Sequence, residues 1–404
     1  MENLNKNSEN NISSEKAEDL IRNYKYQEAL DIFENILKKN LDSSEPNKIN
    51  FAYDYRNISR VQFLIGKYLE AKENALKSLD IATKLLKEDD PYIIEENIRL
   101  SEIYAEYDCW DECEKCINFV KEKNKNTYGE RDKFWIHIYE LMGKYLNGQK
   151  KFYHSIKAIE KAESLVEEHF GHKSKEMANL YHLKSKPYFL RQEYEKSMDY
   201  LKEALKIREE IFGKKSLEVA ECFASMFLNY LAIGDVDKGL ETGKNAIDIR
   251  RNIFGGENHR LIGESYITIA PLYLGQDPKK SLEYAQKALS IFEKCVGSNS
   301  YDCASCYQLM AMFLCAVEPT SNKINEYFEN SLKIRNLHFG ETHLKICELY
   351  EDWGAIKLQT TGEGFEPLFE KSLKIKEEIL RKNDPNLALA YFKVSETIPD
   401  KVEQ

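Results

Sequence analysis

Clustered thiols are the first candidates for chemistry in this sequence. Cys109, Cys113 and Cys116 share one short segment, and Cys303 and Cys306 form a second group. Thiolates at such spacing hold zinc when a second pair of Cys or His residues completes a tetrahedral set. No such pair follows at ligand spacing, so we interpret these side chains as thiols buried between helices and expect no metal site. The odd total of nine cysteines favours reduced thiols and a cytoplasmic protein.

Other groups that could act in catalysis have simpler interpretations. His259 and His343 fall where turns between repeats are expected, which favours a structural role. Glu209-Glu210 lies beside helix-surface lysines, which indicates solvated charge rather than a catalytic pair. Gly143-Lys144 and similar dipeptides lack the upstream glycine of a Walker loop, and no hydrolase or kinase signature occurs. We therefore predict no catalytic residues, no enzyme activity and no cofactor.

Composition narrows the class of partner. The formal net charge of -10, without a basic stripe, argues against binding to nucleic acid. The sequence contains no run of about 18 apolar residues, so no membrane span is expected. With 42% hydrophobic residues and only nine prolines, the chain should fold, mostly as helix.

A recurring glycine shows what positions these side chains. Successive members of one set are 42 residues apart, except for a last step of 43: Gly129, Gly171, Gly213, Gly255, Gly297 and Gly340. Most follow an apolar-periodic run, as in Glu210-Ile-Phe-Gly213, where a left-handed helix cap is expected. A fixed period of this length is typical of stacked helical hairpins.

Other columns share the period. The aromatic column contains Tyr26, Tyr68, Trp110, Phe152 and Tyr194, followed by Val236 and Pro278. The column three residues later is small throughout: Ala29, Ala71, Cys113, Ser155, Ser197, Gly239 and Ser281. Small residues let two helix backbones approach closely, and the aromatic residue fills the adjoining groove. The pattern predicts a hairpin with helices over 217–233 and 236–254, joined at Gly234.

The phrases Gly66-x-Tyr68-x-x-Ala71 and Gly234-x-Val236-x-x-Gly239, with Ala204-Leu205, resemble the tetratricopeptide repeat. Phrases such as 200–213 are similar to the long-helix repeats of kinesin light chains and nephrocystin-like proteins. The resemblance implies an all-α, right-handed superhelical solenoid of about nine antiparallel hairpins plus a C-terminal capping helix. The groove of kinesin light chains carries paired asparagines on successive first helices. In this sequence the corresponding pair of the fourth hairpin is Glu140-Leu141.

The resemblance further implies that first helices line a concave groove that binds a protein or peptide. The groove positions that it implies are Tyr53, Arg56, Arg60, His137, Lys144, Asn179, His182, Lys186, Leu228 and Met312. These change from charged to apolar along the chain. We expect acidic groups of a partner near the basic members and its apolar portion over Leu228 to Met312; a merely solvated charged face is the alternative.

The predicted organisation is a disordered tail over 1–13, a solenoid over 14–385, a capping helix over 386–398 and a tail over 399–404. Pro187 and Pro271 fall inside first helices and are expected to bend them. The predicted function is a non-enzymatic interaction scaffold. A peptide-sensing regulator and a permanent subunit of a cytoskeletal or ciliary assembly are the alternatives.

Overall fold

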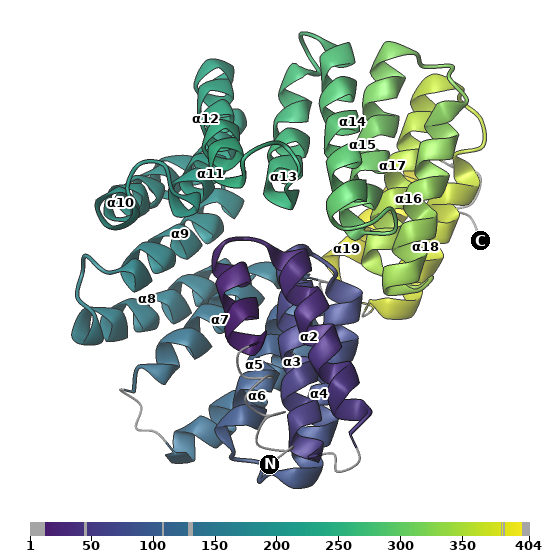
Figure 1. The fold of residues 1–404 in the computed structure, drawn as a ribbon. Helices are drawn as coiled ribbons and strands as arrows, with labels where there is room; N and C mark the ends of the chain where they lie inside the picture. The colour runs from purple at the N-terminus through teal and green to yellow at the C-terminus, as the bar shows by residue number, and fades with distance from the viewer. Residues whose placement is uncertain are drawn as a thin grey trace. The chain divides into compact units, whose positions relative to one another are not determined.

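The structure, a computed structural model, describes residues 13–43, 47–106, 109–127, 132–380, 382 and 384–397. Within these ranges all regular structure is helical, which confirms the predicted all-α solenoid of tetratricopeptide type (Figure 1). Helices α2 to α12, and again α13 to α19, each pack on their neighbours in sequence, and some first helices also contact the first helix of the next hairpin, as α5 contacts α7 and α7 contacts α9. None of the described helices has both the length and the apolar character needed to cross a membrane.

The chain divides into two compact units between Phe254 and Gly255, and the solenoid over 14–385 stays a prediction. The first unit contains a helix over 13–22, then α2 (Tyr26–Leu41), α3 (Lys48–Ile65), α4 (Tyr68–Leu85), α5 (Pro91–Glu106), α6 (Trp110–Thr127), α7 (Phe134–Gly148), α8 (Phe152–His169), α9 (Lys175–Leu190), α10 (Tyr194–Phe212), α11 (Leu217–Ala232) and α12 (Val236–Phe254). The second contains α13 (Arg260–Ile269), η1 (Ala270–Tyr273), α14 (Pro278–Cys295), α15 (Tyr301–Val317), α16 (Lys323–Phe339), α17 (Leu344–Thr360), α18 (Glu366–Ile379) and α19 (Pro385–Thr397).

The recurring glycines end the second helices as predicted. Gly213 and Gly340 directly cap α10 and α16 with φ of 80° and 76° and ψ of 163° and -176°. This extended backbone at positive φ is open essentially to glycine alone, but it is not the left-handed helical conformation. Gly171, Gly255 and Gly297 also have positive φ just after a helix end, whereas Gly129 lies outside the described residues. Glycine with positive φ after the second helix is thus confirmed at these five positions, whereas Gly213 and Gly340 lack the left-handed helical geometry that was expected.

Within a hairpin the small column of the second helix meets small residues of the first helix, such as Ser59, Ser101 and Gly143. Side chains of one helix bond to backbone carbonyls of the other. Ser59 Oγ on the first helix of one hairpin donates to Ala71 O on the second at 2.7 Å. In the next two hairpins the second helix donates to the first: Cys113 Sγ to Ser101 O at 3.4 Å, and Ser155 Oγ to Gly143 O at 2.9 Å. A Cβ on Gly143 would lie 2.9 Å from Ile159 Cγ1. The helices are therefore too close for larger residues, which is the reason for the small columns.

A column of buried cations joins successive hairpins, and the sequence analysis did not identify it. Arg208 on α10 donates to the Asn179 side chain of α9 at 3.1 Å and to the Glu218 carbonyl of α11 at 2.7 Å. Arg335 on α16 repeats the arrangement with Gln308 of α15 and the carbonyl of Lys345 on α17. Each guanidinium thus links a second helix to the first helices on both sides.

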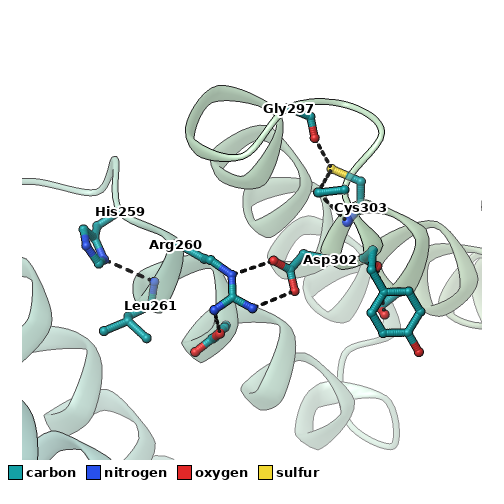
Figure 2. Close-up of polar contacts among 10 residues, drawn as sticks. His259, Arg260, Leu261, Gly297, Asp302 and Cys303 are labelled. Carbon is teal, nitrogen blue, oxygen red and sulfur yellow. Dashed lines mark hydrogen bonds and ion pairs between the residues drawn. The ribbon is translucent and has the colours of Figure 1, made fainter. Parts of the chain in front are cut away.

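Polar groups also connect first helices in the second unit (Figure 2). Arg260 on α13 binds both carboxylate oxygens of Asp302 on α15, at 2.7 and 3.2 Å, and pairs with Glu264 at 2.7 Å. The His259 ring caps α13 by accepting from Leu261 N at 3.3 Å, and His343 caps α17 in the same way. The structural interpretation of these two histidines is confirmed.

The two prolines act differently. Pro271 ends α13, because the chain continues as the 3₁₀ helix η1 from Ala270. Pro187 lies within α9, which continues unbroken to Leu190. At the C-terminus α19 spans Pro385–Thr397, and Leu387 and Ala390 are buried there. The predicted tail over 1–13 ends in a helical residue, Ser13; most of that tail, and the one over 399–404, lie outside the described residues.

Candidate functional site

The first unit contains a cavity of about 620 Å³. Its wall is built mainly from the first helices α5, α7 and α9, with contributions from α3 and α6. The lining residues are Phe63, Ser101, Glu102, Ala105, Glu106, Trp110, Cys113, Leu141, Lys144, Asn147, Gly148, Leu183, Lys186 and Leu190. The volume is typical of ligand pockets, which range over about 300–1,000 Å³.

The lining residues come from positions spaced 42 residues apart. Glu102, Lys144 and Lys186 occupy one such position on α5, α7 and α9. Leu141 and Leu183 occupy another. Because equivalent residues of stacked helices face the same side, short sets of equivalent side chains form a continuous wall.

The charged residues on the cavity wall differ in sign from helix to helix. Glu102 on α5 is an acid, whereas its equivalents on α7 and α9 are lysines. Lys144 Nζ lies 3.8 Å from Glu102 Oε1, and 49% of the lysine side chain is exposed. Lys186 is exposed and has no ion-pair partner among the described residues. The cavity therefore offers positive charge on α9 and acidic groups on α5.

An aromatic side chain closes one part of the wall. Trp110, at the start of α6, packs against Gly148, the last residue of α7. A Cβ at Gly148 would lie 2.1 Å from Trp110 Cζ2, so the indole occupies the space that any side chain there would need. Burial raises the pKa of the nearby Cys113 thiol to about 12, which keeps it protonated and unreactive.

The predicted basic positions on α3 do not offer free charge. Arg56 Nε lies 2.8 Å from the buried Glu96, and its guanidinium also pairs with Glu95. Its Cζ lies 4.5 Å from the centre of the Tyr92 ring. Arg60 pairs with Glu18 of the first helix. Both arginines therefore already have carboxylate partners within the unit, and their binding to an acidic group of a partner stays a prediction.

Three further predicted residues make contacts within the fold. The Asn179 side chain accepts a hydrogen bond from Arg208. His182 Nε2 is 2.8 Å from Ser225 Oγ, so it joins α9 to α11. Burial, and to a lesser extent Arg208 and Lys186, lower the pKa of His182 to about 4. His137 Nδ1 lies 3.4 Å from Glu140 on its own helix.

The remaining predicted residues are partly exposed. Tyr53 is 46% exposed and packs edge to face on Tyr92, with ring centres 4.8 Å apart. Leu228 is 40% exposed on α11 of the first unit, and Met312 is 36% exposed on α15 of the second. The cavity therefore includes Lys144 and Lys186 out of the ten predicted positions.

Several cavity residues outside the predicted set lie at the same 42-residue spacing. Glu102 lies midway, by 42 residues each way, between Arg60 and Lys144, both of which were selected. Trp110 was assigned only to the packing column. Asn147 has no counterpart of its type at 42-residue spacing, since the equivalent residues are Ala105 and Phe189. No sequence signal identified it.

Comparisons with known proteins agree with this architecture. Residues 188–218 match the family model of the tetratricopeptide repeat. A comparison with curated proteins gives no match.

Three solved structures are similar. The Rap conjugation gene regulator of plasmid pLS20, in complex with the Phr* peptide, is 13% identical with a TM-score of 0.51 over 88% of this chain and 90% of that one. A Rap protein complexed with Competence and Sporulation Factor is 15% identical with a TM-score of 0.50 over 87% and 98%. BtubC (BKLC) from P. vanneervenii is 18% identical with a TM-score of 0.44 over 55% and 89%. The chain is a tetratricopeptide-type helical repeat protein.

Proposed function

We propose that this chain is a non-enzymatic interaction scaffold that binds a peptide, or an extended segment of a partner protein, in the cavity of the first unit. The observation that carries the proposal is the cavity itself, since its wall combines apolar side chains with charges of both signs. Such a surface suits a segment with an apolar anchor and at least one acidic group.

The expected orientation follows from the charges. An acidic group of the segment lies near Lys186 and Lys144, while a basic or amino group lies toward Glu102 and Glu106. An apolar side chain packs beside Trp110 and Leu183. Since Arg56 and Arg60 are already paired, the acidic partner suggested by the sequence is recognised on α7 and α9 instead.

Selection and charge reversal test the proposal. Random 12-residue peptides displayed on phage are selected on the purified chain, and the recovered peptides are measured by fluorescence anisotropy. The double variant Lys144→Glu/Lys186→Glu should bind them at least about tenfold more weakly, because like charges then face each other. The matched control Lys202→Glu/Lys206→Glu changes two exposed lysines of α10 and should bind as the wild type does. Equal binding by both variants, or no recovered peptide, contradicts the proposal.

A peptide-sensing regulator is a second candidate. The observation that favours it is the shared fold with a Rap regulator whose structure holds the Phr* peptide. Hydrogen exchange separates the candidates: a scaffold gains protection only around the cavity, whereas a sensor also changes protection in hairpins remote from it, such as α11 and α12.

A further inference from the structure

Asn147, on α7, is a buried amide without partners. Only 3% of the residue is exposed, yet neither Oδ1 nor Nδ2 has a hydrogen-bond partner among the described residues. A buried donor or acceptor that makes no hydrogen bond loses more free energy than an ordinary bond gains. Such a group in a cavity wall therefore requires an explanation.

Other buried asparagines of the first unit satisfy their amide Nδ2 locally, although Oδ1 of Asn124 and of Asn229 also lacks a hydrogen-bond partner among the described residues. Asn97, Asn124 and Asn229 each donate Nδ2 to the backbone carbonyl four residues earlier, at 2.9, 2.8 and 3.1 Å. The equivalent carbonyl for Asn147 is that of Gly143, and it already accepts the Ser155 hydroxyl at 2.9 Å in addition to its place in the helix. Because both lone pairs of the Gly143 carbonyl oxygen already accept hydrogen bonds, this oxygen does not accept a further one from Asn147 Nδ2.

Asn147 lines a cavity with room for a ligand, and both polar atoms of its amide are buried behind the cavity surface. Asn147 lies one turn after Lys144 and directly before Gly148, against which Trp110 packs. A side-chain amide presents one acceptor and two donor hydrogens in one plane. A peptide bond presents the complementary carbonyl and N–H along an extended backbone. The charged and apolar residues of the cavity wall would then select the side chains of a bound peptide. The Asn147 amide would instead bind the peptide backbone, whatever the peptide sequence.

We propose that Asn147 is a backbone-binding residue: its Nδ2 donates to a carbonyl, and its Oδ1 accepts an N–H, of an extended peptide segment in the cavity, after the side chain turns toward it. This rests on the proposed function, because it assigns a contact within the same cavity. Asn147 lies seven residues after Glu140, the fourth-hairpin equivalent of the paired asparagines in kinesin light chains.

The test separates stability from binding. Asn147→Leu replaces the amide with an apolar group of similar size, so the melting temperature should stay the same or rise, because the unpaired polar atoms are gone. The affinity for a phage-selected peptide should fall about tenfold, as expected for the loss of two hydrogen bonds. The matched control Asn229→Leu removes an amide that already bonds within its own helix, so it should lower the melting temperature and leave the affinity unchanged.

Backbone N-methylation of the same peptide identifies the bond without altering the protein. One methylated position should weaken binding to the wild type and have no effect on binding to Asn147→Leu. Unchanged affinity in Asn147→Leu, together with weakening by Lys144→Glu/Lys186→Glu, overturns the role of Asn147 and leaves the proposed function intact. If no peptide is selected, both are overturned.

Discussion

Replacing Gly148 with alanine places a methyl group where the Trp110 ring lies. The new Cβ would be 2.1, 2.2 and 2.6 Å from three indole carbons, closer than packed atoms can approach. Overpacking of this kind costs about 1–3 kcal/mol. Alanine recovers at most about 1 kcal/mol of helix propensity over glycine, and less at the last residue of a helix. The net loss should be about 1–2 kcal/mol.

Thermal unfolding followed by circular dichroism measures this loss. For a unit of this size the loss corresponds to a fall in Tm of roughly 2–8 °C. Gly275→Ala is the matched control, because no atom lies within 4 Å of a Cβ there, and it should leave Tm nearly unchanged. In a Trp110→Ala background the effect of Gly148→Ala should disappear, since the clashing ring is gone. An equal effect of Gly148→Ala with and without Trp110 would refute the placement of the indole in the cavity wall.

Three further predictions follow from buried groups. His182 has a pKa of about 4 in the folded chain against an ordinary 6.5, so its neutral form stabilises the fold above pH 6.5 and this stability is lost as the pH falls toward 4. In denaturant titrations across this range, the unfolding free energy of the wild type should fall by about 3 kcal/mol more than that of His182→Gln. Parallel curves of unfolding free energy against pH would contradict the prediction. Arg208→Met should lower the unfolding free energy by about 2–4 kcal/mol, because the Asn179 side chain and the Glu218 carbonyl lose a charged hydrogen-bond donor. In the same denaturant titration, the control Lys206→Met on the exposed side of α10 should leave the unfolding free energy nearly unchanged. A disulfide reagent should modify the half-buried Cys109, Cys295 and Cys315 first and reach the six buried thiols only on unfolding, so rapid native labelling of all nine contradicts the burial.

Local sequence rules predicted the hairpins well because each rule acts within one repeat. The helices expected over 217–233 and 236–254 are α11 and α12, each within one residue at the ends. A glycine after an apolar run, or a small column opposite another, has the same physical meaning in every hairpin.

Contacts between repeats were less predictable, because they depend on which side chains reach one another. Arg56 and Arg60 had the spacing of a groove, but carboxylates on neighbouring first helices neutralise them. The Ile-Arg phrases ending at Arg208, Arg250 and Arg335 were visible in the sequence, yet charge near a helix end usually indicates solvent exposure. Asn147 was beyond sequence reasoning, since its isolation depends on Ser155 occupying the carbonyl of Gly143.

Site-specific photo-crosslinking tests most directly the central claim that the cavity of the first unit binds a peptide segment. A benzophenone amino acid replaces Ala105 in the cavity wall, and in a control chain it replaces Tyr153, which is 63% exposed on α8 and outside the cavity. Each chain is irradiated with a phage-selected peptide, and the products are mapped by mass spectrometry. The account predicts a peptide adduct at position 105 that is lost in Lys144→Glu/Lys186→Glu, and little at position 153. Crosslinking at 153 without crosslinking at 105 would contradict it.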